Sequence, residues 1–181
     1  MNPTLLTFTG RTIDMLDPKP SDIVLEDIAH CLAVQARFNG HFAGWHYSVA
    51  EHSVHVADLL RGWGEPTDVQ RAGLMHDAAE AYVGDLIGPM KKALRALAGG
   101  PSGFDEIERR WSLAIGGRFG VALEPMSDSV KLADLAQFAQ EDFELRGVPI
   151  PGLFSGRPVQ SMGPSCAMEF FVDAAERLGV R

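Results

Sequence analysis

The stretch "AGLMHDAAEAYVGD", residues 72–85, sets helix-forming apolar residues around a crowded group of polar ones. His76 and Asp77 are adjacent, Glu80 follows about one helical turn later, and Asp85 comes directly after a glycine. The stretch contains no lysine or arginine that could neutralise its three carboxylates. Carboxylates this close in sequence require a physical reason to be placed together.

A bound cation is one such reason. Residues 68–83 have the apolar spacing of a helix, on which side chains three and four residues apart share a face. We therefore expect His76, Asp77 and Glu80 to project from one surface. Imidazole and carboxylate together suit divalent manganese, iron, cobalt or zinc, and such an ion removes the repulsion. The alternative is a core histidine with satisfied hydrogen bonds beside a solvated acidic face.

Helical spacing continues along most of the chain on both sides of this stretch. Gly- and Pro-rich segments separate the helical runs, and none is long enough for a domain linker. We expect helices from Ser21 or Asp22, as N-cap, to near Arg37, and over about 49–61, 68–83, 89–98, 104–119, 128–146 and 165–178.

Two of these helices begin with a capping-box pattern. In this pattern a hydroxyl and an acid or amide three residues later satisfy each other's free backbone donors. Ser48 with Glu51 and Thr67 with Gln70 have this spacing. The pattern predicts helix starts just after Ser48 and Thr67.

The N-terminus is the one strand-like part of the chain. Residues 4–16 alternate apolar and β-branched residues around Gly10, which predicts a short hairpin. The predicted fold is all-α, a single helical-bundle domain with a short N-terminal β-hairpin, and no internal repeat is found. Its expected parts are an N-terminal β element over 1–20, a helical core over 22–146, and a C-terminal loop and helix over 147–181, together one domain over 1–181.

Bulk composition narrows the function classes. The 181 residues are 46% hydrophobic and 22% charged, which is ordinary for one globular domain. A net charge of −8 argues against nucleic acid as a partner. Cys31 and Cys166 are far apart and lack metal-type spacing, so we expect a reduced, cytoplasmic protein. With no signal-like start and no run of 18 apolar residues, neither secretion nor membrane insertion is expected.

Two further polar residues stand in helices that otherwise read as core. His52 lies in "YSVAEHSVHVADLL" beside an apolar stripe that includes Val56 and Leu60. Asp134 lies in "SVKLADLAQFA", flanked by apolar residues. Either residue taken alone is more often an ordinary helix residue than a ligand.

Taken in order, His52, the His76-Asp77 pair and Asp134 resemble the HD-domain metal-dependent phosphohydrolases. "YSVAEHSVHVA" resembles their first ligand helix, "LMHDAAEAYVGDLIGPMKKAL" the second and "VKLADL" the last. "ARFNGH" is similar to the segment that carries an Arg-aromatic pair in bacterial HD-type 5′-deoxynucleotidases. Short phage-type HD dATP triphosphohydrolases look similar over the same region. The resemblance covers roughly residues 22–146.

The resemblance implies a metal centre. Its ligands are His52, His76, Asp77 and Asp134, which leave open positions for water and a phosphate oxygen. The implied cofactor is a divalent transition metal, either cobalt, manganese, zinc or iron, with magnesium as a second ion on the phosphates. Glu80 has the place of a general base or water-orienting group, and its alternative is an exposed helical glutamate.

The resemblance also assigns substrate contacts. Arg37 and Lys91 are expected to neutralise phosphate charge, and Asp85 to accept a hydrogen bond from a sugar 3′-hydroxyl. His41 is a further expected substrate contact. Phe38 departs from the pattern, because tryptophan typically follows the arginine in the deoxynucleotidases and crowds the ribose 2′ position. The smaller phenylalanine puts a strict preference for deoxyribose in question.

His55 lies three residues after His52 and could face the same metal. The matching position in the relatives is not a ligand. We therefore expect His55 to have a polar supporting role or a surface position.

The expected substrate is a small nucleotide. Two reactions fit, both by water attack at the α-phosphorus: release of phosphate from a 5′-monophosphate, or of triphosphate from a deoxynucleoside triphosphate. Lys91, Lys92 and Arg95 supply more charge than a monophosphate needs, although an exposed helix often carries such cations. The alternatives are hydrolysis of (p)ppGpp and a catalytically silent nucleotide-binding protein. The relatives are homo-oligomers, so at least a dimer is expected.

Overall fold

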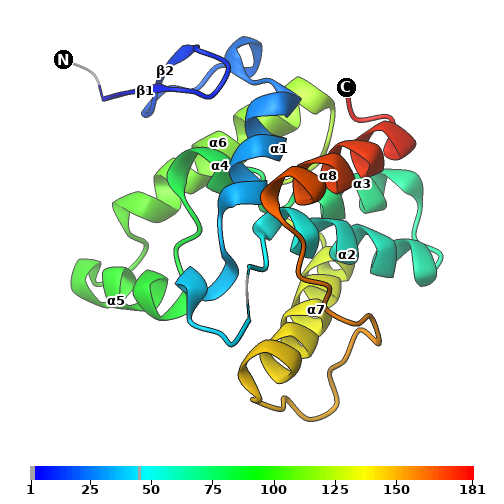
Figure 1. Ribbon diagram of the computed structural model, residues 1–181. Helices are drawn as coiled ribbons and strands as arrows, with labels where there is room; N and C mark the ends of the chain where they lie inside the picture. Colours follow the sequence, from blue (N-terminus) through cyan, green and yellow to red (C-terminus); the bar gives the residue numbers. More distant parts are fainter. Residues whose placement is uncertain (1–2, 45) are drawn as a thin grey trace.

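The computed structural model describes residues 3–44 and 46–181, and a short N-terminal hairpin precedes a bundle of helices (Figure 1). The all-α prediction is confirmed. The hairpin strands are β1 (Thr4–Leu6) and β2 (Thr12–Asp14). Two 3-10 turns, η1 (Pro20–Asp22) and η2 (Arg37–Gly40), flank the first of the helices α1 (Leu25–Val34), α2 (Val49–Gly62), α3 (Thr67–Met75), α4 (Glu80–Val83), α5 (Gly88–Ala98), α6 (Gly103–Phe119), α7 (Asp128–Arg146) and α8 (Pro164–Leu178).

The N-terminal hairpin forms where the sequence predicts it. Its strands are antiparallel, with Leu5 opposite Ile13, and Gly10 has a φ of 82° in the turn between them. Glycine adopts this conformation without steric cost. The predicted β element over 1–20 includes residues 1 and 2, which lie outside the described residues.

Helix α2 lies at the centre of the bundle. Every residue from Val49 to Leu60 is buried, and the helix contacts α1, α3, α7 and α8 (Figure 1). The predicted capping box begins it: the Ser48 hydroxyl accepts from the Glu51 amide, and Glu51 accepts from the Ser48 amide. Polar side chains on the buried part of this helix can find hydrogen-bond partners only inside the protein, and His52 finds such partners in the site described below.

One predicted helix start and one predicted capping box are wrong. Ser21 and Asp22 belong to η1, and α1 begins later at Leu25 with Val24 in the N-cap position. Helix α3 has Pro66 as its N-cap residue and no side-chain cap. Gln70 donates to the Glu65 carbonyl oxygen at 2.7 Å, and the N-cap residue Pro66 has no amide hydrogen that could take part in a capping box.

The predicted continuous helix over 68–83 is also wrong. Helix α3 ends at Met75, a tight turn follows, and α4 starts at Glu80. Within the turn, amides bond three residues back, as from Glu80 to the Asp77 carbonyl at 2.9 Å. The Gly73 carbonyl, the acceptor that Asp77 would use in a continuous helix, accepts from His76 Nδ1 at 2.8 Å instead. The functional stretch is therefore a turn between two helices.

Helix α5 lies at the edge of the bundle, on the left in Figure 1. None of its residues is buried, and Leu97 is 87% exposed. Among the described residues, no helix combines the length and apolar character needed to cross a membrane. Cys31 and Cys166 are both free thiols. The single-domain boundaries and the homo-oligomer stay predictions.

Candidate metal centre and substrate cavity

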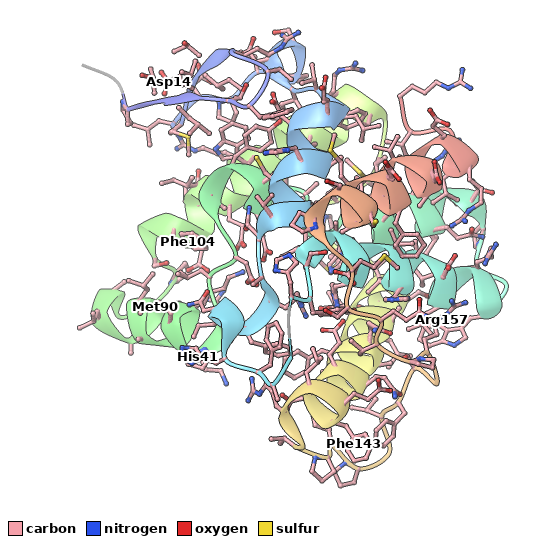
Figure 2. All side chains as sticks on the ribbon, in the orientation of Figure 1. Asp14, His41, Met90, Phe104, Phe143 and Arg157 are labelled. Carbon is pink, nitrogen blue, oxygen red and sulfur yellow. The ribbon has the colours of Figure 1, made fainter. Side chains whose placement is uncertain are left out.

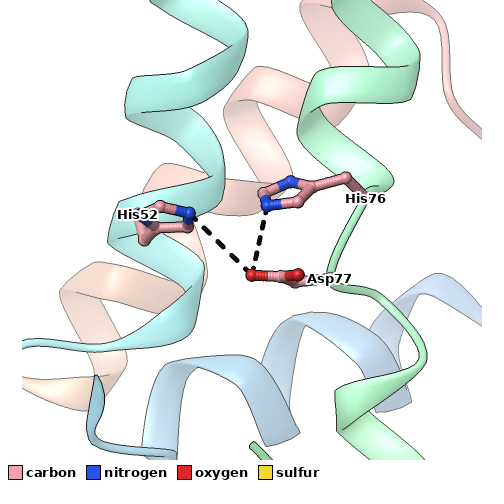
Figure 3. Close-up of side chains that lie close together, drawn as sticks. All are labelled: His52, His76 and Asp77. Carbon is pink, nitrogen blue, oxygen red and sulfur yellow. Dashed lines mark ion pairs between the residues drawn. The ribbon is translucent and has the colours of Figure 1, made fainter. Parts of the chain in front are cut away.

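His52 on α2 and the pair His76 and Asp77 in the α3–α4 turn point toward one another (Figure 3). One ligand atom from each lies within 4.8 Å of the others. Asp77 Oδ2 is 3.2 Å from His76 Nε2 and 3.9 Å from His52 Nε2. These three side chains could hold a metal ion.

Asp134 on α7 also lies close to this cluster. Its Oδ1 lies 3.1 Å from His52 Nε2 and 3.8 Å from His76 Nε2. Its side chain is 39% exposed, whereas both histidine side chains are buried. The structure thus brings together the four side chains that the family resemblance implies as ligands. Solvent can reach the cluster at Asp134.

The residues present fit a divalent metal. His76 Nδ1 donates to the Gly73 carbonyl, so Nε2 is the ring nitrogen that faces the cluster, and among the described residues this buried atom meets no hydrogen-bond criteria despite lying near Asp77. A buried polar atom without a partner costs free energy that a cation would recover. His52 Nδ1 lies 2.6 Å from Glu141 Oε1, so its Nε2 also faces the cluster. Two imidazole nitrogens and two carboxylates are donors that first-row metals accept.

His76 and Asp77 shift each other's pKa in opposite directions. Burial lowers the pKa of His76, but the charges and hydrogen bonds of Asp77 and Asp134 together outweigh burial, and the pKa rises well above its usual value. Burial raises the pKa of Asp77, but the charge and hydrogen bond of His76 and the charge of His52 together outweigh burial and bring the pKa to about 2. Metal ligation requires neutral imidazole, so cation binding should release protons from this cluster.

Glu80, the first residue of α4, lies beside the cluster but outside it. It is only 5% exposed, and its Oε2 is buried with no hydrogen-bond partner in the described chain. Lys91 Nζ lies 3.9 Å from Oε1. Burial, followed by the charges of Asp77 and Asp85, raises the pKa of Glu80 well above its usual value. Glu80 is therefore a carboxyl group that binds a proton more readily than an ordinary glutamate does.

A cavity of about 610 Å³ opens onto the cluster. Its lining includes the acids Asp77, Glu80 and Asp134 and the apolar residues Leu135, Ile87, Pro89 and Phe138. All five predicted substrate contacts line this cavity: Arg37, Phe38, His41, Asp85 and Lys91. Figure 2 shows His41 on the side of the molecule where α5, marked by Met90, faces η2. The cavity suits a molecule with an anionic end and a ring.

Phe38 occupies a strained position in the cavity wall. It has a φ of 56° and Asn39 a φ of 52°, a region that residues other than glycine rarely adopt. The Phe138 ring lies 5.6 Å from the Phe38 ring, and Arg146 Cζ lies 4.8 Å from its centroid. Arg146 and Phe138 line the same cavity and were missed from the sequence.

Arg37 and Lys91 are both held by acids. Arg37 Nη1 lies 3.6 Å from Asp77, while Nε and Nη2 donate to Glu141 at 3.2 and 3.1 Å. Lys91 Nζ donates to Glu108 at 2.7 Å. Burial lowers the pKa of Lys91, but the hydrogen bond and charge of Glu108 and the charges of Glu80 and Asp77 together outweigh burial, and the pKa is raised. Both side chains are therefore cationic.

Two supporting residues were also missed from the sequence. Gln35 donates to the Glu80 carbonyl at 3.0 Å and accepts from the Asp85 amide at 2.9 Å, which fixes both ends of α4. Glu141 is fully buried beneath His52. It follows Asp134 by two helical turns, so its position on the same face of α7 was the available signal.

A second cavity, of about 430 Å³, lies on another side of the cluster. It shares Asp77, Glu80, Lys91 and Asp134 with the first cavity. The rest of its lining is mostly charged and includes Arg95, Arg109, Asp105, Glu108 and Glu124. The metal cluster is thus accessible from two differently lined spaces.

His55 is not in the cluster, and it is not on the surface. Its side chain is buried, with its ring 5.9 Å from that of Phe170 on α8. Neither ring nitrogen has a hydrogen-bond partner among the described residues. Burial lowers the pKa of His55.

This fold and this donor set define a class of helical proteins built around a His-Asp cluster that can hold a divalent metal. A profile of the HD domain matches residues 49–101, which span α2 to α5 and include His52, His76 and Asp77. The chain belongs to the HD-domain family. HD domains bind divalent metals, and the family points to the superfamily of metal-dependent phosphohydrolases.

Two relatives match most of the chain. An uncharacterized protein of Rhodobacter capsulatus is 40% identical over 147 residues, which cover 77% of this chain and 71% of the relative. The uncharacterized protein YfdR of Escherichia coli is 31% identical over 179 residues, which cover 92% and 90%. Neither name carries a substrate, so the choice of substrate depends on the site itself.

Proposed function

We propose that this protein is a metal-dependent deoxynucleotide phosphohydrolase that directs water to the α-phosphorus of a 5′-nucleotide. The observation that carries the proposal is the 610 Å³ cavity, because its lining combines Asp77 of the metal cluster with further acids, with cations, and with apolar and aromatic side chains. A nucleotide likewise combines an anionic phosphate with a flat base.

His52, His76, Asp77 and Asp134 hold the divalent transition metal in this proposal. When bound, such an ion supplies positive charge for a phosphoryl oxygen and makes water more acidic. Arg37 and Lys91 add fixed cationic charge on the protein side. Arg37 presents Nη1 toward Asp77, and the Lys91 ammonium lies near Glu80, so both can meet phosphate oxygens at the cluster.

Glu80 acts as the general base. Its partnerless Oε2 accepts a hydrogen bond from the attacking water and orients it. As the water oxygen bonds to phosphorus, the bond from phosphorus to the 5′-oxygen breaks. The water proton passes to Glu80, whose raised pKa allows it to keep that proton until the leaving 5′-oxygen takes it. Atoms and charge balance without another reactant.

The nucleoside occupies the remaining part of the cavity. Phe38 and Phe138 supply aromatic surface for the sugar and base, and His41 stands at the exposed rim. Asp85, whose backbone amide Gln35 fixes, accepts from the sugar 3′-hydroxyl. Phe38 lies against Arg146 rather than free in the cavity, and discrimination against ribose is therefore expected to be incomplete.

The length of the phosphate chain separates two versions of this function. A 5′-nucleotidase needs only the first cavity. A triphosphohydrolase needs further space for two phosphates, and the second cavity offers this with Lys91, Arg95 and Arg109 in its lining. Its carboxylates could share a magnesium ion with those phosphates. Both reactions remain in the proposal.

Product analysis tests the proposal. Metal-stripped protein is incubated with manganese, cobalt, zinc or magnesium and a panel of ribo- and deoxynucleoside mono- and triphosphates, and the products are separated by chromatography. Nucleoside with phosphate identifies the nucleotidase, and nucleoside with triphosphate identifies the triphosphohydrolase. No product with any metal would reject the proposal, and (p)ppGpp hydrolysis and silent nucleotide binding would then be tested.

A further inference from the structure

Glu141 is a buried acid on α7 that contacts three other parts of the site. Its side chain is fully buried. Oε2 accepts from Nε and Nη2 of Arg37 at 3.2 and 3.1 Å. Oε1 accepts from the Tyr47 hydroxyl at 2.9 Å and lies 2.6 Å from His52 Nδ1. One carboxylate is therefore shared between a candidate metal ligand and a cation expected to face phosphate.

His52 depends on this contact for its tautomer. The ring can offer a lone pair at Nε2 only when Nδ1 carries the proton. Glu141 Oε1 is an acceptor placed at Nδ1, and it favours that arrangement. His76 receives the same orientation from the Gly73 carbonyl. Both rings thus have an acceptor at Nδ1, a side-chain carboxylate for His52 and a backbone carbonyl for His76.

Arg37 depends on the other oxygen. A guanidinium has five donors and no acceptor, so an anion that takes two of its N–H groups fixes the plane of the group. With Nε and Nη2 held by Glu141, Nη1 lies 3.6 Å from Asp77, on the cavity side. Removing the anion would free the guanidinium to turn.

We propose that Glu141 is a positioning residue that orients His52 for metal binding and Arg37 for phosphate binding at the same time. The inference rests on the proposed function, because the role that it gives Glu141 exists only if the site binds a metal and a phosphate. It adds a residue outside the four ligands, and it predicts that metal affinity depends on a side chain that does not touch the metal.

Replacing the Glu141 carboxylate with an amide should preserve its contact with Arg37 and reverse its contact with His52. In a Glu141→Gln variant only one terminal atom can accept. Arg37 cannot accept a hydrogen bond, so the amide oxygen must face Arg37 and the NH₂ group must face His52. His52 Nδ1 then has to accept, the ring proton moves to Nε2, and the lone pair needed by the metal is lost.

Calorimetric titration with Mn²⁺ tests this outcome. We expect E141Q to bind Mn²⁺ about 10–100-fold more weakly than the wild type. Glu144→Gln makes the same chemical change three residues further along α7 at an exposed position, and it should bind as the wild type does. Equal affinity of E141Q and wild type overturns the inference and leaves the proposed function standing. A wild type that binds no divalent metal overturns both.

The wild-type protein offers a second measurement in case E141Q does not fold. In the zinc-loaded protein, nitrogen-15 NMR of the histidine rings reports which nitrogen carries the proton. We expect His52 to carry a slowly exchanging proton on Nδ1, because Glu141 shields and holds it. A proton on Nε2, or rapid exchange at Nδ1, contradicts the inference without any substitution.

Discussion

Asp77 and Glu80 are three residues apart, yet their surroundings move their pKa values in opposite directions. The charge and hydrogen bond of His76, with the charge of His52, together outweigh burial and bring the pKa of Asp77 to about 2, whereas burial and two neighbouring acids raise the pKa of Glu80. Asp77 is therefore an anion at neutral pH, suited to ligate a cation. Glu80 can exchange a proton, which is the property that a general base needs.

Replacing Glu80 tests this division of roles. Glu80→Gln keeps the size and one acceptor but cannot take a proton. We expect kcat for the substrate found in the product screen to fall about 10²–10⁴-fold, with the affinity for Mn²⁺ nearly unchanged. Steady-state kinetics and calorimetry measure the two quantities, with Glu144→Gln as the matched control. An unchanged kcat would remove Glu80 from the mechanism.

His55 makes a prediction about stability and pH. Burial lowers its pKa in the folded protein below the usual 6.5, so the unfolded chain binds its proton first as the pH falls. The resulting loss in the free energy of unfolding is absent above pH 6.5 and grows as the pH falls from 6.5 toward the pKa of His55 in the folded protein. Urea unfolding between pH 7 and 5 should show a steeper loss of free energy in wild type than in His55→Phe. Parallel pH profiles would contradict the assignment.

At the residue scale, the candidate metal ligands could be predicted from the sequence, whereas the residues that hold these ligands in place could not. His52, His76 and Asp77 share ligand chemistry, and their spacing brings them within 4.8 Å of one another. Glu141 gave no signal on its own, because a glutamate in a helix is usually exposed. Its burial depends on Arg37, Tyr47 and His52 converging from other segments, and such convergence is a tertiary property.

At the element scale, α6 gives a test of packing. An alanine Cβ at Gly116 would lie 2.6 Å from the Val121 carbonyl oxygen, whereas one at Gly117 would lie 3.4 Å from Pro20 Cγ. Backbone cannot move aside cheaply, so Gly116→Ala should lower the free energy of unfolding by about 1–3 kcal/mol.

The neighbouring glycine is its control. Gly117→Ala should be neutral or stabilising by up to about 1 kcal/mol, because alanine favours helix over glycine. Urea denaturation measures both variants. Equal effects of the two substitutions would mean that the close approach of Val121 to α6 is not the cause.

Helix positions were predictable where caps and spacing agreed with packing. Ser48 begins α2 as its pattern indicates, and α7 has the predicted bounds. The break after Met75 was not predictable, because alanines at 78 and 79 favour a helix, whereas the His76 bond to the Gly73 carbonyl that accompanies the break depends on a side chain. In the functional stretch, the helix preference of the local sequence is therefore overridden and a turn forms.

For the whole molecule, metal binding should couple to folding. The cluster joins α2, the α3–α4 turn and α7, so a cation held there binds the folded chain and not the unfolded one. At a free metal concentration 100 times Kd, the free energy of unfolding should rise by about 2.7 kcal/mol. Denaturation with and without Mn²⁺ measures the gain, and Asp77→Asn should lose most of it. An equal gain in the variant would place the ion elsewhere.

Adding metal back to the stripped protein, with product release as the readout, tests the central claim most directly. The account predicts no nucleotide hydrolysis without metal, and activity that rises with Mn²⁺ and saturates as one high-affinity site per chain fills. Asp77→Asn should stay inactive over the same range. Full activity in the stripped protein, or equal recovery of the variant, would contradict a metal-dependent phosphohydrolase centred on His52, His76 and Asp77.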